Sequence, residues 1–147
     1  MILGSNCTRN CKFCNVTCGK PEPVDPEEPM NVALASKKLG LRHVVLTCST
    51  RDDLPDGGAE QFARCVRAIR EVCPGTTVET LISDMKGNTD ALDIVIAAHP
   101  EVLNHNVETV KELQSAALPP RWAIPSSSVP PTRSAVSAPD SATTKNN

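Results

Sequence analysis

The stretch HVVLTCSTRDDLPDGGAEQFARCVRAIREVCPGTTVETLI, residues 43–82, decides the fold class. It begins with a short apolar, β-branched run at 43–47 and ends with a second such run at 77–82, and both favour strands. Between them, apolar residues recur at helical spacing over residues 59–73, and Pro74 follows as a stop signal. A strand, a helix and a strand in this order predict two parallel strands joined by a right-handed crossover. The stretch therefore indicates an α/β fold.

The same alternation of strands and helices extends outward from this stretch on both sides. About four strand–helix units follow one another, which predicts parallel strands whose carboxyl ends share one edge. Because the loops after such strands build the site in parallel barrels and open sheets, the polar loops that follow the strands are the candidate site. The further predicted elements are a strand at MIL (1–3), a helix from about Pro29 to Leu39, a helix with Thr89 as its N-cap candidate, a strand at EVLN (101–104) and a helix from Thr109.

The composition of the 147 residues excludes several classes of function. The net charge of -2 and the aromatic content of 2% leave neither a basic surface for a nucleic-acid backbone nor aromatic platforms for bases. No apolar run approaches the roughly 20 residues of a membrane-spanning helix, and the start MILGSNC lacks the features of a signal peptide. We therefore expect no nucleic-acid partner, no membrane partner and a cytoplasmic, reducing location.

A change of composition near Gln114 divides the chain into two parts. The segment that follows is rich in Ser, Pro, Ala and Thr, carries proline pairs at 119/120 and 130/131, and shows no sustained periodicity. Such a segment buries too little apolar surface to offset the entropy of ordering. We predict a folded core over residues 1–116 and a disordered tail over residues 117–147.

Four of the seven cysteines lie in the loop NCTRNCKFCNVTCG, residues 6–19. An odd number of cysteines gathered near one end does not resemble a secreted disulfide framework, so a metal or cluster site is favoured. A zinc site would need all four thiols from this one short loop, because no second pair of Cys or His follows at the usual distance. A ferredoxin-type run has two-residue spacers and a Cys-Pro end, which this loop lacks. The spacing by itself leaves zinc and iron–sulfur binding open.

The pattern C-x-x-x-C-x-F-C in this loop resembles the signature of radical S-adenosylmethionine (radical SAM) enzymes. Cys7, Cys11 and Cys14 match the three cysteines of that signature, and Phe13 matches its aromatic residue. The resemblance implies a [4Fe-4S] cluster held by the three thiolates, with one iron left open for S-adenosyl-L-methionine. An open position is what makes a metal site reactive rather than structural. Cys18 lies outside the three-thiol pattern.

Longer motifs resemble the lipoyl synthase family from residue 1 to about residue 113. They are MILG-x-x-CTR-x-C-x-FC-x-V, VVLT-x-x-x-RDDLPDGGA, AIRE, D-x-x-GN and NHNVETV. The resemblance implies a partial parallel (β/α) barrel of the radical SAM type, and an enzyme that inserts two sulfurs at C6 and C8 of a protein-bound octanoyl group. Its implied partners are octanoylated lipoyl-carrier protein domains and an electron donor such as ferredoxin or flavodoxin.

The same resemblance implies which side chains serve the cofactors, whereas it leaves the catalytic residues unassigned. A structural interpretation stays open for the carboxylates, since Asp52 precedes a helix whose N-terminus favours negative charge. The implied residues for S-adenosylmethionine binding are Phe13, Thr47, Arg51, Asp52, Asn104, Asn106 and Glu108, and the implied cluster ligands are Cys7, Cys11 and Cys14.

The two ends of the chain depart from the pattern of the family. Lipoyl synthases carry three further cysteines upstream for an auxiliary cluster, and further strand–helix units after the region that ends here near Gln114. We therefore expect a fragment that binds S-adenosylmethionine without completing sulfur insertion. The alternatives are a non-catalytic iron–sulfur or zinc-binding module and an inert fragment. Cys48 stands where the family usually has serine, and Cys65 and Cys73 are expected as small core residues.

Overall fold

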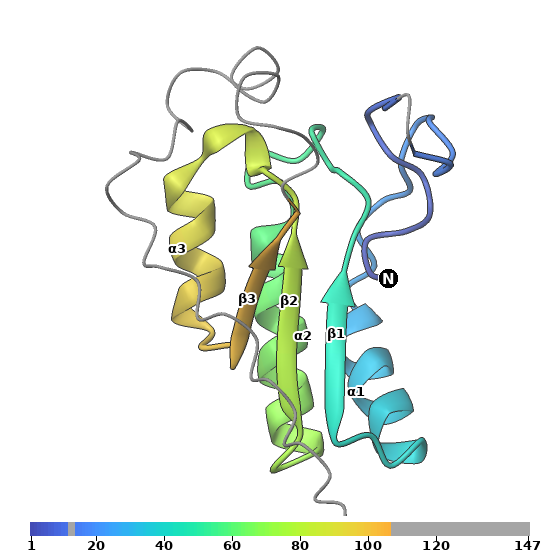
Figure 1. Ribbon diagram of the computed structural model, residues 1–147. Helices are drawn as coiled ribbons and strands as arrows, with labels where there is room; N and C mark the ends of the chain where they lie inside the picture. The colour runs from blue at the N-terminus through green and yellow to red at the C-terminus, as the bar shows by residue number, and fades with distance from the viewer. Residues whose placement is uncertain (12–13, 107–147) are drawn as a thin grey trace, which may run out of the picture.

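The computed structural model describes residues 1–11 and 14–106 of the chain. Its sheet has three parallel strands in the order β1-β2-β3, as Figure 1 shows. The strands are β1 His43–Thr47, β2 Thr77–Ile82 and β3 Val102–His105. The helices are α1 Glu28–Lys38, α2 Ala59–Val72, α3 Thr89–Ala97 and the short 3-10 helix η1 Met85–Gly87. The predicted α/β class and the parallel strand order are confirmed.

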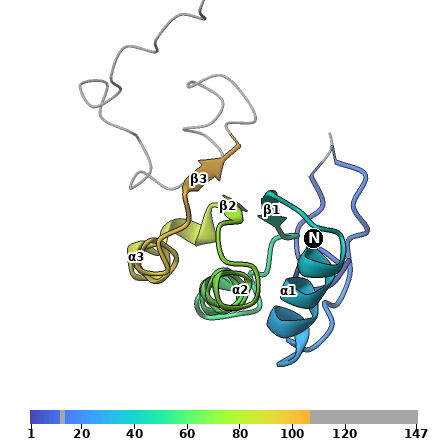
Figure 2. The ribbon, with the colours of Figure 1, turned by 90° about the horizontal axis from the view of Figure 1, so that it is seen from below.

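All three α-helices cover the same face of the sheet, which Figure 2 shows along the strands. On β1 and β2 the residues alternate, so that Val44 and Val78 are buried while Val45 is exposed. Phe62 and Ile69 on α2 are fully buried beneath them, and burying side chains of this size stabilises the fold by about 1.5–3 kcal/mol each. The core therefore lies between the sheet and α2. Within residues 1–11 and 14–106, no helix has the length and apolarity that crossing a membrane requires.

The start of α2 is packed tightly against the beginning of the chain. Its N-cap, Gly58, has a φ of 93°, a left-handed conformation that disfavours residues with a Cβ. A Cβ at this position would lie 2.3 Å from Cδ1 of Leu3, which is buried. The carboxylate of Asp56 accepts hydrogen bonds from the backbone N–H groups of Gly58 and Glu60. Glycine is therefore required where α2 begins.

The strand predicted at residues 1–3 is wrong. Ile2 forms a single parallel bridge with Cys48, supported by a 2.8 Å hydrogen bond from its N–H to the carbonyl of Thr47. The next residue, Leu3, has a φ of 66° and donates its N–H to the carboxylate of Glu28, so the ladder stops after one pair. The segment nevertheless lies beside β1, on the edge opposite β2. The order of segments across the sheet thus follows their order in the chain.

Several predicted boundaries shift by one residue. β3 begins at Val102, one residue later than predicted. Glu101 contacts β2 partly through its side chain, since its N–H donates to the carbonyl of Val78 while its carboxylate accepts from the N–H of Val78. The N-cap of α3 is Asn88 rather than Thr89, since the Asn88 side chain accepts from the N–H of Ala91. The helix predicted from Thr109 and the tail predicted over 117–147 lie outside the described residues.

Candidate functional site

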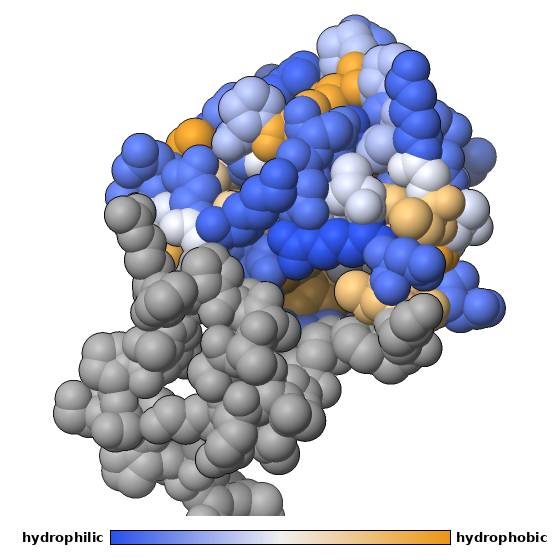
Figure 3. Space-filling view, turned by 90° about the horizontal axis from the view of Figure 1, so that it is seen from above, coloured by the Kyte–Doolittle hydropathy of each residue, from blue (hydrophilic) through white to orange (hydrophobic). Residues whose placement is uncertain are grey.

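The carboxyl ends of the strands meet at one rim of the molecule. The loop at 48–58 leaves β1, the loop at 83–88 leaves β2, and the chain at residue 106 leaves β3. The loop of residues 4–19, called the cysteine loop below, lies beside this rim at the upper right of Figure 1. Figure 3 looks down on the same end, whose coloured surface is mostly hydrophilic. Four sequence segments thus converge where the sequence predicted the site.

The cysteine loop folds back on itself through a bridge between Cys7 and Cys18. The N–H of Cys7 donates to the carbonyl of Thr17 at 2.9 Å, and the N–H of Gly19 donates to the carbonyl of Cys7 at 3.1 Å. Cys7 is buried at the base of the loop, whereas the other thiols of the loop are exposed and none forms a disulfide. The exposed cysteines are Cys11, Cys14 and Cys18.

Thr8 ties the cysteine loop to the loop that follows β1. Its N–H and its hydroxyl both donate to the carbonyl of Thr50, at 3.1 and 3.0 Å. The same hydroxyl accepts from the N–H of Asp52 at 3.1 Å. Because a hydroxyl can donate one hydrogen bond and accept others, a single side chain meets two backbone groups here. The base of the cysteine loop is therefore held next to the end of β1.

Arg9 makes the longest-range connection of the site, and we call it the Arg9 clamp. Its guanidinium donates to both carboxylate oxygens of Asp52 at 2.7 and 2.8 Å, and to both oxygens of Asp84 at 2.7 Å each. Such paired, charge-assisted hydrogen bonds are among the stronger polar contacts in proteins. Burial, the largest single influence, raises the pKa of Asp84, but the hydrogen bonds from Arg9 and from the backbone N–H of Lys86, together with the charge of Arg9, hold that pKa below its ordinary value. The clamp joins the cysteine loop to the loops after β1 and β2.

Arg51, predicted to contact S-adenosylmethionine, is instead buried, with 2% of its side chain exposed. It donates to the carbonyl of Leu3 at 2.9 Å and to both carboxylate oxygens of Asp53 at 2.9 Å. Hydrogen bonding to Asp53 raises the pKa of Arg51, and the same contact lowers the pKa of Asp53. Arg51 thus fixes the chain start to the loop after β1. Thr47 ends β1, and its carbonyl accepts from the N–H of Ile2.

Asn104 lies on the helix-free face of the sheet, within a hydrogen-bonded row across all three strands. Its side-chain amide donates to Glu79 at 3.2 Å, and the other carboxylate oxygen of Glu79 lies 3.2 Å from Nε2 of His43. Asn106 is exposed just beyond β3. Asn104 and Asn106 thus lie at the carboxyl end of β3, on the edge of the sheet away from the cysteine loop, since β1 and β2 stand between β3 and the loop. Phe13 and Glu108 lie outside the described residues.

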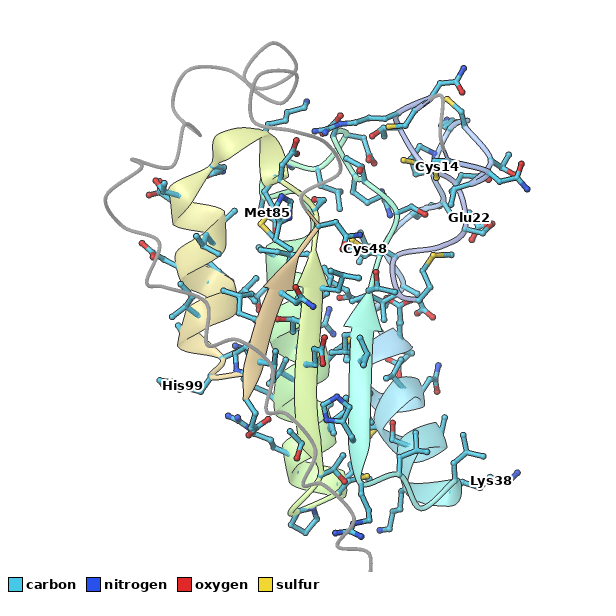
Figure 4. All side chains as sticks on the ribbon, viewed as in Figure 1. Cys14, Glu22, Lys38, Cys48, Met85 and His99 are labelled. Carbon is cyan, nitrogen blue, oxygen red and sulfur yellow. The ribbon has the colours of Figure 1, made fainter. Side chains whose placement is uncertain are left out.

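Cys48 lies at the rim beside the cysteine loop, and Figure 4 shows it between Met85 and Cys14. Burial, and then the nearby thiol of Cys7, raises the pKa of Cys48 to about 12. A thiol that ionises so reluctantly is a poor nucleophile at neutral pH. Lys38 and His99 mark the opposite, amino-terminal end of the strands in the same view.

The donor set of the cysteine loop fits an iron–sulfur cluster in its chemistry. Thiolates are the ligands that such clusters take, and Cys7, Cys11 and Cys14 are free and close together in sequence. Across residues 1–11 and 14–106, no three Cys, His, Asp or Glu side chains stand close enough together to hold a metal ion. The structure thus brings the three cysteines into one anchored loop, without showing them gathered around a common point.

Sequence reasoning missed the partners of this loop. Arg9 belongs to the quoted CTR motif, but nothing in the sequence pairs it with Asp84, which lies 75 residues away. Sequence reasoning also overlooked Glu79 on β2, the partner of Asn104, because a carboxylate in a short strand resembles an ordinary solvent-facing residue.

Comparison with known proteins identifies the family. A model of the radical SAM superfamily matches residues 1–123. The chain is 55% identical over 119 residues to the lipoyl synthase of Caldanaerobacter subterraneus subsp. tengcongensis, covering 81% of this chain and 42% of that protein. It is 57% identical over 113 residues to the lipoyl synthase of Aquifex aeolicus, covering 77% of this chain and 41% of that protein. It is 55% identical over 119 residues to the lipoyl synthase of Rubrobacter xylanophilus, covering 81% of this chain and 37% of that protein.

These matches confirm the resemblance to lipoyl synthases that the sequence motifs indicated. The chain spans about two fifths of the length of these curated relatives. The family model covers most of the chain, and the described residues have the parallel α/β architecture that the motif predicted. This chain therefore belongs to the radical SAM superfamily.

Proposed function

We propose that this chain takes part in the lipoyl synthase reaction, the insertion of two sulfurs at C6 and C8 of a protein-bound octanoyl group. The observation that carries the proposal is the cysteine loop, which Thr8 and Arg9 hold against the rim at the carboxyl ends of the strands. Sites of parallel α/β folds form at this rim. The identity of 52–57% to proteins named lipoyl synthase supports the specific reaction.

In this proposal Cys7, Cys11 and Cys14 hold a [4Fe-4S] cluster. When bound, such a cluster supplies an open iron for S-adenosyl-L-methionine and the electron that cleaves it to a 5′-deoxyadenosyl radical. The protein's part is to keep the three thiols in one loop and to fix that loop over the strand ends, which Thr8 and Arg9 do through hydrogen bonds to the loop after β1.

The proposed contacts to S-adenosylmethionine need revision for two residues. Every carboxylate oxygen of Asp52 is already bonded to Arg9, and Arg51 is buried among Leu3 and Asp53. We therefore assign both residues to holding the loops in place. Thr47 keeps its proposed role at the end of β1, because a hydroxyl can donate to or accept from the polar groups of the cofactor.

For Asn104 and Asn106 the proposed role is hydrogen bonding to S-adenosylmethionine through their side-chain amides, which can both donate and accept. Asn104 lies on the helix-free face of β3, where Glu79 orients it, and Asn106 follows the strand. Phe13 and Glu108 remain predicted contacts.

The partners in this proposal are an octanoylated lipoyl-carrier domain and an electron donor such as ferredoxin or flavodoxin. The location in this proposal is the reducing cytoplasm, where free thiols persist and can hold a cluster.

The experiment is an anaerobic incubation of the reconstituted chain with dithionite, S-adenosylmethionine and a carrier domain. The 5′-deoxyadenosine released and the mass of the carrier are measured with octanoylated and with unmodified carrier. Release that depends on Cys7, Cys11 and Cys14 and rises with the octanoyl group supports the proposal. Equal release with both carriers argues against the octanoyl substrate, and no release at all argues against radical chemistry.

One observation favours a second candidate, a closed metal site without catalysis. Cys18 lies directly opposite Cys7, so four thiols are available in one loop. Four thiolates would occupy every position of a tetrahedral zinc ion and leave none open. The variant Cys18→Ser separates the two: it keeps its iron–sulfur cluster if three thiols suffice, and it loses bound metal if the site is closed. Cys65→Ser, a buried thiol in α2, is the matched control.

A further inference from the structure

Cys18 is the cysteine of the loop that the three-thiol pattern does not use, yet it is the residue paired with Cys7 in the backbone. We propose that Cys7 and Cys18 are a disulfide site, which closes by exchange with a small disulfide such as oxidised glutathione and thereby withdraws Cys7 from metal binding. The regulatory part of this inference rests on the proposed function, in which Cys7 is a cluster ligand. The pairing itself does not depend on it.

The geometry that carries the proposal is the parallel bridge. The N–H of Cys7 donates to the carbonyl of Thr17, and the N–H of Gly19 donates to the carbonyl of Cys7. These two hydrogen bonds make Cys7 and Cys18 register partners. Strands bonded in this way lie about 4.7–4.9 Å apart, and register partners point to the same side. Disulfides join Cα atoms about 4.4–6.8 Å apart. The Cα spacing expected of such register partners therefore falls within the range of a disulfide.

The exposure of the two sulfurs sets the order of events. Cys18 is exposed, so its thiolate can attack a dissolved disulfide, whereas Cys7 is buried and lies opposite Cys18 in the backbone bridge. The N–H of Arg9 points at the sulfur of Cys7 at 3.4 Å, which orients it. Cys48 also lies near Cys7, but its backbone partner is Ile2. The register therefore selects Cys18 over Cys48.

The exchange proceeds in two balanced steps. The Cys18 thiolate attacks one sulfur of oxidised glutathione, the glutathione S–S bond breaks, and one glutathione thiolate leaves. The Cys7 thiolate then attacks Sγ of Cys18 in the mixed disulfide and expels the second glutathione. Two electrons pass from the two cysteines to glutathione, and the two thiol protons are taken up by the released glutathione thiolates.

Peptide mapping of the full chain tests the site directly. Trypsin cleaves after Arg9 and Lys12 but not after Lys20, which precedes a proline. Peptide 1–9 therefore contains Cys7, peptide 10–12 contains Cys11, and peptide 13–37 contains both Cys14 and Cys18. After reduction, removal of metal and exposure to oxidised glutathione, we expect peptide 1–9 cross-linked to peptide 13–37, with fragmentation locating the bond at Cys18. The link disappears in Cys18→Ser and persists in Cys14→Ser and Cys65→Ser.

Two results would overturn the proposal: a link between 10–12 and 13–37 as the main product, which joins Cys11 to Cys14 or to Cys18, or glutathione retained on Cys18. Iron and sulfide uptake then tests the consequence. Cross-linked wild-type chain is expected to take up no cluster until a thiol reductant is added, whereas Cys18→Ser treated alike takes it up at once after removal of glutathione. If the link forms and uptake is unchanged, the disulfide site stands and the assignment of Cys7 as a ligand fails.

Discussion

Replacing Arg9 by glutamine removes the clamp that joins three loops of the rim. The side chain of Arg9 is 31% exposed, and those of the two acids it holds, Asp52 and Asp84, are 20% and 12% exposed. Exposed ion pairs contribute about 0.2–1 kcal/mol, whereas breaking a buried pair costs about 3–5 kcal/mol. The clamp lies between these cases, so we expect Arg9→Gln to lower the free energy of unfolding by about 2 kcal/mol. Part of this loss is repulsion, since two neighbouring carboxylates are left without their shared cation.

The assay is urea unfolding at pH 7 and low salt. With a slope of about 1–3 kcal/mol per molar urea, a loss of this size moves the midpoint down by about 1 M. The difference from the wild type should shrink as salt is added, because the clamp is partly exposed and is therefore screened. Ser5→Ala, a substitution on the same loop without the charge, is the control.

A double-mutant cycle shows whether the loss comes from the clamp itself. Asp84→Asn should destabilise the wild type but stabilise the Arg9→Gln variant or leave it unchanged, since the partner of Asp84 is already gone there and the substitution removes the repulsion with Asp52. Strictly additive effects, or a change below about 0.5 kcal/mol for Arg9→Gln, would refute the interpretation that Arg9 holds the cysteine loop to the rim.

Three further outcomes follow from the geometry. The hydrogen bonds from Arg9 and from the N–H of Lys86 keep the pKa of Asp84 below its unfolded value of about 3.9, so this carboxylate stabilises the fold above that pH and its contribution is lost as the pH falls through the folded pKa. The free energy of unfolding of Asp84→Asn should therefore depend less on pH below about pH 4 than that of the wild type, and an unchanged dependence would contradict the pairing. Gly58→Ala should lower the free energy of unfolding by about 2 kcal/mol or more, because the position has a positive φ and its Cβ would meet Leu3. Thermal unfolding measures this loss, and an unchanged melting temperature would contradict the packing of Leu3 against Gly58. At pH 8 iodoacetamide should label the exposed Cys18 well before the partly buried Cys48, whose pKa is raised to about 12; mass spectrometry follows the labelling, and equal rates for the two cysteines would contradict this difference in environment.

The sequence predicted those parts of the fold that depend on local patterns. The helix at Ala59–Val72 was foreseen because its apolar residues recur at helical spacing and a Pro-Gly pair ends it. The strand at 1–3 failed because its ladder is broken by a left-handed Leu3, and a backbone angle at a leucine leaves no mark in an apolar run. Local reasoning thus found the layers of the fold and missed where one of its edges stops.

The candidate site was predicted in place but only partly in detail. The cysteine loop and the loops after the strands do share one rim, as parallel strands require. Arg51 was expected to face a ligand, yet burial decides its role, and burial depends on contacts between distant segments such as the one with Leu3. The pairing of Arg9 with Asp84 spans 75 residues and arises from the fold alone.

The central claim is that Cys7, Cys11 and Cys14 hold a cluster with one open iron. The most direct measurement is electron paramagnetic resonance of the anaerobically reconstituted and reduced chain, recorded with and without S-adenosyl-L-methionine, together with the iron and sulfide content. We predict one [4Fe-4S] signal per chain that changes when S-adenosylmethionine is added, that is lost in each single Cys→Ala variant of the three, and that persists in Cys18→Ser and Cys65→Ser. A signal indifferent to S-adenosylmethionine, or one that Cys18→Ser abolishes, would contradict the open-iron site.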